Sequence, residues 1–129
     1  MANIPADLRY TREHEWVKIS GNKARVGITD YAQSALGDVV YIDFPKVGTE
    51  IKAMAVAGTI ESVKAVSEIY QPLSGKIAAV NSDLNKNPAL VNTDPYNAGW
   101  LFEIEDIAEA EAANLLDAGA YEAHLKTLG

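Results

Sequence analysis

The sequence predicts a mainly β protein, folded as a sandwich or flattened barrel, with a short internal helix and C-terminal helices. Short runs of alternating apolar and polar residues recur through 10–104, and turn-forming Gly, Pro, Asn and Asp separate them. Six or more short strands divided in this way are typical of that class. From residue 106 the apolar residues take a helical spacing. A chain of 129 residues suits one domain, 1–129, with a β body at about 10–104 and a helical segment at about 106–127.

The composition excludes several classes of function. Apolar residues make up 48% of the chain and charged residues 22%, which is ordinary for a globular protein. The net charge of −7 argues against binding to nucleic acid or anionic lipid, and no apolar run approaches the roughly 20 residues of a membrane span. Because the sequence contains no cysteine, disulfides, thiolate catalysis and Cys-ligated zinc are excluded. The N-terminus lacks the features of a signal or transit peptide, so we expect a cytoplasmic protein.

The first predicted element is a β-hairpin. Residues 16–20 and 23–28 alternate between apolar and polar types. The two residues between them, Gly21 and Asn22, favour a type II′ turn because glycine stands first. Trp16, like Trp100 further along, is expected to be a core aromatic residue.

A short helix and another strand follow this hairpin. Thr29 or Asp30 is suited to cap a helix that runs through Leu36, and Gly37 is suited to end it in a left-handed conformation. A strand is predicted over 38–44, with its odd-numbered residues on one face and its even-numbered residues on the other. Pro45 to Gly48 then form a turn.

The remaining strands are predicted between residues 56 and 104. Residues 56–69 have a β pattern centred on a hairpin, and 76–80 form another strand. Residues 81–88 are polar and rich in turn formers. Leu90-Val91 and 99–104 are expected to complete the β body.

The C-terminal segment is predicted to be helical and strongly acidic. Asp106 and Glu109 have the spacing of a capping box, and Ala118-Gly119 is expected to divide two helices that cover a sheet edge. Tyr121, Leu125 and Leu128 share one face of the second helix. Residues 103–129 contain seven acidic residues and one lysine, a net charge of −6. This segment is either a solvated helix face or a docking surface for a basic partner.

No catalytic set is evident in the sequence. The two histidines, His14 and His124, are far apart in the sequence and belong to no metal-binding motif. No nucleophile elbow, phosphate-binding loop or dinucleotide-binding motif is present, and the carboxylates have no spacing that selects an acid–base pair. The sequence therefore gives almost no sign of an enzyme that acts alone.

Lys64 is the strongest candidate for a functional residue. It lies in the middle of 61–68, where the pattern predicts a hairpin with Lys64 at or beside the turn. On pattern alone, an ordinary exposed turn lysine explains this position. However, turn glycines stand 16 residues before it, at Gly48, and 11 residues after it, at Gly75. A lysine centred between two such turns resembles the lipoyl and biotinyl carrier modules.

Motifs along nearly the whole chain resemble the H protein of the glycine cleavage system. The resemblance runs from about Tyr10 to Leu125, and the motifs follow the order of the family. They are His14-Glu15-Trp16-Val17, Gly27-Ile28-Thr29-Asp30-Tyr31-Ala32-Gln33, Leu36-Gly37-Asp38-Val39-Val40, Glu61-Ser62-Val63-Lys64-Ala65, Asp94-Pro95-Tyr96 and Gly99-Trp100-Leu101.

This resemblance implies a fold, a cofactor and a set of partners. The fold would be a lipoyl-domain-like barrel-sandwich hybrid, and lipoic acid would be attached to Lys64 as a lipoamide. The protein would be a non-catalytic, monomeric carrier that shuttles the aminomethyl group of glycine. Its partners would be a PLP-dependent glycine decarboxylase, an aminomethyltransferase, dihydrolipoyl dehydrogenase and lipoate-attachment enzymes.

The resemblance also implies a surface cleft that shelters the loaded arm. A cationic amine in such a cleft needs carboxylate or hydroxyl partners. By position, Glu15 and Glu68 match the candidates of the family, although both are also explained as solvated surface residues. Glu13 departs from the pattern, since many members have a small hydroxyl residue there.

Three alternatives to a glycine-cleavage carrier stay open at this point. A biotinyl carrier is one, although biotinyl sites typically flank the lysine with methionines, whereas Val63 and Ala65 flank Lys64. A lipoyl donor or regulatory protein without glycine cleavage is the second. The third is an interaction domain with no prosthetic group, in which Lys64 would have no special role.

Overall fold

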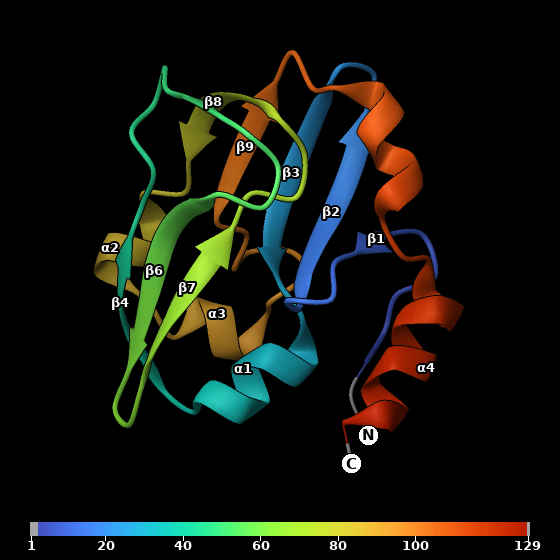
Figure 1. Cartoon of the computed structure of the whole chain (residues 1–129). Coiled ribbons are helices and arrows are strands. Elements are labelled where there is room, and N and C mark those ends of the chain that lie inside the picture. The colour runs from blue at the N-terminus through green and yellow to red at the C-terminus, as the bar shows by residue number, and fades with distance from the viewer. Residues whose placement is uncertain (1–2, 129) are drawn as a thin grey trace.

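Two antiparallel sheets form the body of the molecule (Figure 1). A computed structural model describes residues 3–128, so both ends of the predicted domain 1–129 lie outside the described residues. The larger sheet has the strand order β1 (Arg9–Tyr10), β2 (Glu15–Ser20), β3 (Lys23–Ile28), β9 (Phe102–Glu105), β8 (Gly75–Val80) and β5 (Glu50–Ile51). The smaller sheet has the order β4 (Val39–Asp43), β6 (Val56–Ser62) and β7 (Val66–Tyr70). The prediction of a mainly β sandwich is therefore confirmed.

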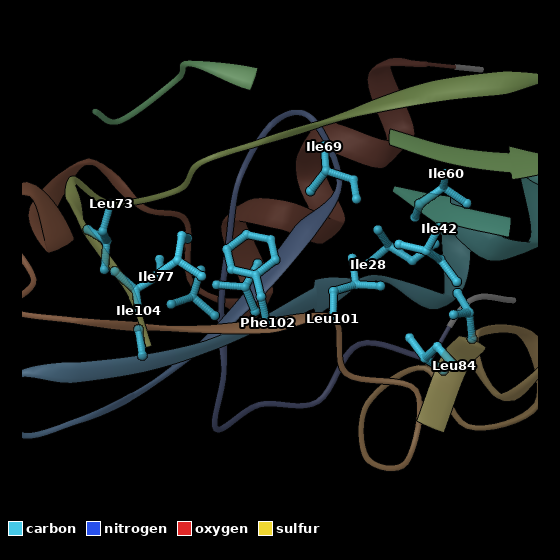
Figure 2. Close-up of a cluster of buried hydrophobic side chains, with 14 of the residues drawn as sticks. Ile28, Ile42, Ile60, Ile69, Leu73, Ile77, Leu84, Leu101, Phe102 and Ile104 are labelled. Atoms are coloured by element: carbon cyan, nitrogen blue, oxygen red, sulfur yellow. The ribbon is translucent and has the colours of Figure 1, made fainter. Parts of the chain in front are cut away.

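The main hydrophobic core lies between the two sheets (Figure 2). Ile42, Ile60 and Ile69 face inward from the smaller sheet and are almost fully buried. Strands of the larger sheet contribute Val17, Val26, Ile77, Phe102 and Ile104 to the same cluster. Burial of these side chains is the main force that holds the sheets face to face.

The first predicted hairpin is confirmed. Strands β2 and β3 pair from Glu15↔Ile28 to Ser20↔Lys23, which leaves Gly21 and Asn22 as the turn. Of these two, Gly21 alone has a positive φ, 62°, as a type II′ turn requires. Trp16 is buried as predicted, whereas Trp100 is only half-buried.

The internal helix α1 (Asp30–Leu36) begins and ends at the predicted residues, but the residue that ends it has another conformation than expected. The Thr29 side chain caps it by accepting a hydrogen bond from the Ala32 amide at 3.2 Å. Gly37 ends the helix with φ 79° and ψ −157°. The positive φ was expected, but the extended ψ takes Gly37 out of the left-handed helical region into one that only glycine adopts readily.

Strand β4 does not keep the predicted alternation of its two faces. Its pairing with β6 shifts register between Val39 and Tyr41, which indicates a β-bulge. As a result Val39 and Ile42 are both buried, while Val40 and Tyr41 are both exposed. A bulge adds one residue to one strand, and a simple period of two cannot anticipate it.

The prediction that Leu90-Val91 belongs to the β body is wrong. After the short helix α2 (Asp83–Lys86), these residues begin a helical turn, α3 (Leu90–Thr93), and Val91 reaches the core from there. A two-residue apolar run does not distinguish a strand from a buried helical turn.

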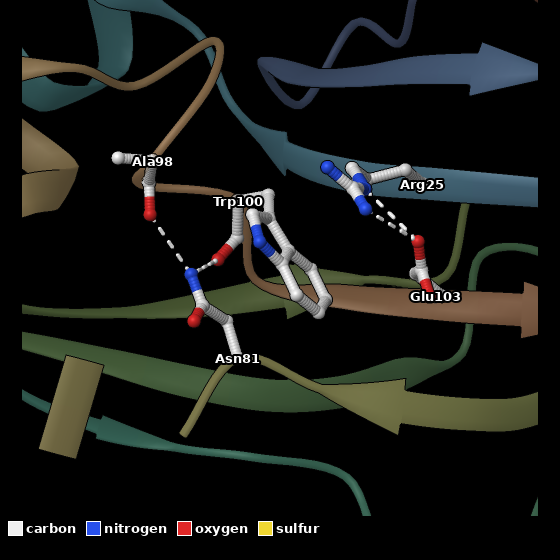
Figure 3. A network of polar contacts seen from close by, with 5 residues as sticks. All are labelled: Arg25, Asn81, Ala98, Trp100 and Glu103. Atoms are coloured by element: carbon white, nitrogen blue, oxygen red, sulfur yellow. Dashed lines mark hydrogen bonds and ion pairs between the residues drawn. The ribbon is translucent and has the colours of Figure 1, made fainter. Parts of the chain in front are cut away.

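Side-chain contacts hold the loop between α3 and β9 onto the larger sheet (Figure 3). The Asn81 amide donates hydrogen bonds to the carbonyls of Ala98 at 2.9 Å and Trp100 at 2.8 Å. Arg25 of β3 pairs with Glu103 of β9 at 2.9 Å, and its guanidinium lies 4.6 Å from the centre of the Trp100 ring. The half-buried Trp100 ring is thus stabilised by a cation–π contact with Arg25.

The C-terminal segment is helical, but its boundaries differ from the prediction. Asp106 has a positive φ, 52°, and caps no helix. A 3-10 helix, η1 (Glu109–Asn114), begins after Ala108 without a side-chain cap. Helix α4 (Ala118–Thr127) then begins at the residues that were expected to break it, because Asp117 caps it.

The C-terminal segment covers a sheet edge, as predicted. Leu116 and Tyr10 exchange two backbone hydrogen bonds, of 2.8 and 2.7 Å, along the outer side of β1. Helix α4 packs beside the same strand, and Tyr121 is fully buried against it. Among residues 3–128, no helix has both the length and the apolar character needed to cross a bilayer.

We expect the substitution Asp117→Ala to destabilise the protein by about 1 kcal/mol. The Asp117 side chain accepts a hydrogen bond from the Ala120 amide at 2.8 Å, which satisfies one of the open donors at the start of α4. Urea denaturation measures the change. The control Glu122→Ala, on the exposed side of α4, should change stability by less than about 0.5 kcal/mol. Equal effects of both changes would contradict a capping role.

Candidate functional site

Strands β6 and β7 form a hairpin whose turn lies at the bottom of the molecule in Figure 1. Lys64 belongs to this turn, between the end of β6 at Ser62 and the start of β7 at Val66. The last paired residues of the two strands are Glu61 and Val66, so residues 62–65 make the turn. The Lys64 side chain is exposed. The structure therefore places Lys64 where another protein could reach its amine.

Hydrogen bonds hold the hairpin tip in one conformation. The Ser62 amide donates to the Ala65 carbonyl at 2.8 Å, and the Ser62 hydroxyl accepts from the amides of Lys64 at 3.3 Å and Ala65 at 3.1 Å. The Val63 amide donates to the Asp38 carbonyl at 3.0 Å, which ties the tip to the start of β4. Sequence reasoning missed Ser62, although a serine two residues before a turn lysine is a recognisable local cap.

The Lys64 side chain extends past the end of α1. A methyl group at Gly37 would lie 3.4 Å from Lys64 Cε. This is an ordinary van der Waals distance, so the stem of the lysine lies beside the end of α1, and the positive φ of Gly37 rather than the space is what favours glycine here. This contact joins two of the motifs, 36–40 and 61–65, that lie apart in the sequence.

A cavity of about 300 Å³ opens beside the hairpin, between α1 and β7. Ala65 and Val66 of the hairpin line it, and so does Leu36, which precedes Gly37. We call this cavity the arm pocket. Its other lining residues are Glu13, His14, Glu15, Ile28, Tyr31, Ala32, Ala35, Ile60, Ser67, Glu68 and Ile69. A larger hollow of about 420 Å³ lies near β5, far from Lys64, and has no buried titratable residue.

The structure brings Glu15 and Glu68 to the same pocket in different environments. Glu15 is only 2% exposed. One of its carboxylate oxygens accepts from the Thr11 hydroxyl at 2.6 Å, and the other accepts from the Tyr70 amide at 3.2 Å. Glu68 is exposed, and it accepts a hydrogen bond from the Tyr70 hydroxyl at 3.3 Å.

Burial changes the acidity of Glu15. Loss of hydration raises the pKa of this carboxyl to about 7, and the hydrogen bonds from Thr11 and Tyr70 only partly oppose the effect. The nearby Glu13 raises the pKa further. Glu15 is thus half ionised near neutral pH, and a cation that entered the pocket would favour its charged form.

The two histidines lie close together, which the sequence did not predict. The ring centres of His14 and His124 are 5.9 Å apart, and His14 lines the arm pocket. Among residues 3–128, no three His, Cys, Asp or Glu side chains are grouped to hold a metal ion.

Exposed apolar side chains surround the hairpin tip. Val40 and Tyr41 on β4, together with Val63 and Val66 on the hairpin, are each about half exposed or more. Tyr41, Glu61 and Val66 are direct neighbours across the three strands of the smaller sheet. Apolar groups gathered on a surface in this way are typical of a protein contact site.

Comparison with known proteins shows to which family this chain belongs. The family model described as glycine cleavage H-protein matches residues 8–128. The chain belongs to the glycine cleavage H-protein family. The match contains the hairpin that carries Lys64 and every residue that lines the arm pocket. The biotinyl-carrier alternative is therefore not favoured.

Individual members of the family match over nearly their full length. The glycine cleavage system H protein of Mycobacterium bovis (strain BCG / Pasteur 1173P2) is 55% identical over 132 residues, which cover 97% of this chain and 98% of that protein. The H protein of Myxococcus xanthus is 53% identical over 124 residues, covering 96% of each chain. A crystal structure of the Mycobacterium marinum H protein matches with a TM-score of 0.85 at 39% identity, covering 95% of this chain and 99% of that chain. This structural neighbour has the lipoyl-domain-like barrel-sandwich fold that the resemblance implied.

Proposed function

We propose that Lys64 bears lipoic acid in amide linkage, and that the chain acts as the lipoyl carrier of glycine cleavage. The observation that carries the proposal is an exposed lysine, fixed at a hairpin tip beside a pocket, in a member of this family. An attachment enzyme needs one amine in one geometry, and the hydrogen bonds of Ser62 and Val63 supply that geometry.

The pocket residues fit the proposed group. When bound, a lipoyl group supplies a dithiol/disulfide that carries the aminomethyl group of glycine between active sites. The apolar walls formed by Ile28, Leu36, Ile60 and Ile69 suit an aliphatic arm, because its burial removes apolar surface from water. The Glu15 carboxylate suits a cationic amine, since a charge-assisted hydrogen bond forms best away from water. Glu68 and Glu13 add negative charge at the pocket.

The partners of the chain would supply the catalytic groups. We propose that the glycine decarboxylase, the aminomethyltransferase, dihydrolipoyl dehydrogenase and the lipoate-attachment enzymes all dock at the hairpin end, where Val40, Tyr41, Val63 and Val66 are exposed. Tethering the cargo makes each transfer depend on protein docking rather than on free diffusion of a small molecule.

We further propose that 1–129 acts as one monomeric, non-catalytic domain. Its cytoplasmic location stays a prediction.

Mass spectrometry tests the attachment directly. Protein produced in cells with a lipoylation pathway should carry one lipoyl group, and peptide mapping should place it on Lys64. The exposed position of the amine predicts complete modification when lipoate is supplied in excess. A protein that stays unmodified under these conditions, or that is modified at another lysine, would overturn the proposal. A biotin-specific streptavidin blot, expected to be negative, separates the two cofactor classes.

A further inference from the structure

His14 forms part of the arm pocket with an unusual backbone conformation. Its φ is 73°, in the left-handed region that few non-glycine residues adopt. Backbone hydrogen bonds hold it there: the His14 amide donates to the Thr11 carbonyl at 3.2 Å, and the Thr29 amide donates to the His14 carbonyl at 3.0 Å. Such a conformation persists only where the surroundings fix it.

The C-terminal helix reaches the His14 side chain through Tyr121. The Tyr121 hydroxyl lies 2.8 Å from His14 Nδ1 and 2.7 Å from the Thr29 hydroxyl oxygen. Tyr121 is fully buried and stacks on Tyr10, with ring centres 4.7 Å apart. On another side, the Tyr31 ring lies 4.7 Å from the His14 ring. Tyr121 and Tyr31 therefore hold the imidazole from two elements, α4 and α1.

The Tyr121 hydroxyl is the centre of a chain of contacts that joins Thr29 to His14. The Thr29 oxygen accepts from the Ala32 amide and also lies within hydrogen-bond distance of the Tyr121 hydroxyl, which in turn reaches His14 Nδ1. Burial, followed by the neighbouring His124, lowers the pKa of His14, and Glu13 opposes this effect. A lowered pKa favours the neutral imidazole, and in a neutral ring Nδ1 can pair with the Tyr121 hydroxyl either as an acceptor or as a donor.

The geometry points to Tyr121 as a positioning residue for the arm pocket: helix α4 fixes the His14 wall of the pocket through the Tyr121 hydroxyl. This inference deepens the proposed function and rests on it, because it gives the C-terminal helix a part in sheltering the arm. Helix α4 lies beside β1 (Figure 1). It contributes no residue to the pocket lining, so its influence on the pocket passes through His14. Removal of one hydroxyl, with the ring retained, should loosen the pocket without unfolding the protein.

The test compares Tyr121→Phe with Tyr10→Phe in the full-length protein. Both changes remove one hydroxyl from the same stacked pair, but the Tyr10 hydroxyl donates to the Pro5 carbonyl and does not touch His14. In unlipoylated protein, ¹⁵N NMR of the His14 ring should show an altered Nδ1 resonance in Tyr121→Phe and an unchanged one in Tyr10→Phe. Identical His14 spectra in all three proteins would overturn the inference.

A second measurement follows the lipoylated protein. After reduction of the arm, its thiols should react with iodoacetamide about three times faster or more in Tyr121→Phe than in the wild type or Tyr10→Phe, as expected for the loss of one buried hydrogen bond. His14→Asn should have a similar effect, because it removes the imidazole ring that Tyr121 holds against the pocket. Asparagine tolerates a positive φ, so the backbone at this position should keep its conformation. The double variant should react no faster than His14→Asn alone, because Tyr121 acts through His14. Additive effects, or equal rates in wild type and Tyr121→Phe, would overturn the inference. Absence of lipoylation would instead contradict the proposed function, and the NMR comparison would still decide the role of Tyr121.

Discussion

The variant Lys64→Arg is expected to carry no lipoyl group and to support no glycine–CO2 exchange above background. Arginine keeps the positive charge, but its guanidinium stays protonated and does not act as the amine nucleophile that amide formation requires. Because Lys64 is exposed at a turn, the change should alter the free energy of unfolding by less than about 0.5 kcal/mol. Intact-mass analysis, an exchange assay with the decarboxylase and urea denaturation measure the three quantities.

Lys23→Arg is the matched control for this experiment. Lys23 is also an exposed lysine beside a tight hairpin turn, at the tip of β2 and β3. This variant should be lipoylated and active like the wild type. Lipoylation that persists in Lys64→Arg, or that is lost in Lys23→Arg, would contradict the assignment. A wild type that is lipoylated but supports no exchange would favour the lipoyl-donor or regulatory alternative.

Glu15→Gln is expected to remove a large part of the pH dependence of stability. The pKa of Glu15 is about 7 in the folded protein, against an ordinary value of 4.5. Because the folded-state pKa is the higher one, the folded protein binds this proton more tightly than the unfolded chain does. The stability that the protonated carboxyl contributes is fully present below about pH 4.5 and is lost as the pH rises through about 7. The loss amounts to about 3 kcal/mol.

Glutamine can take the place of the protonated carboxyl in this site. Its carbonyl oxygen can accept from the Tyr70 amide, and its amide can donate to the Thr11 hydroxyl oxygen. Relative to Glu15→Gln, the wild type should therefore lose about 3 kcal/mol between pH 4.5 and 8. Urea denaturation at several pH values measures the difference.

Glu68→Gln is the control, because Glu68 lines the same pocket but is exposed. The pH dependence of its stability should follow that of the wild type. If the stability curves of wild type and Glu15→Gln run parallel with pH, the carboxyl at Glu15 is not shifted. The variant Glu15→Gln also tests the proposed contact between the Glu15 carboxylate and the amine of the cargo. Glutamine removes the negative charge, so the loaded arm should have a shorter lifetime in this variant.

Local sequence signals determined the elements that present Lys64. The Gly21-Asn22 turn, the Thr29 cap and the hairpin around Lys64 were all predicted correctly, because each depends on the φ/ψ preferences or hydrogen bonds of residues next to one another in the chain. The family motifs, read from the same residues, indicated the fold and the function. Turn and cap chemistry extends over a few residues, so one sequence is enough to read it.

Only the tertiary structure decided the features that depend on distant contacts. The bulge in β4 and the helical turn at Leu90 replaced locally plausible alternatives, because core packing overrides weak local preference. The raised pKa of Glu15 follows from burial, which no sequence pattern states. The contact between His14 and Tyr121 joins opposite ends of the chain, where no local pattern couples the two residues. Sequence thus determined which lysine is presented, whereas the fold decided what surrounds it, because burial and long-range hydrogen bonds exist only once the sheets have packed.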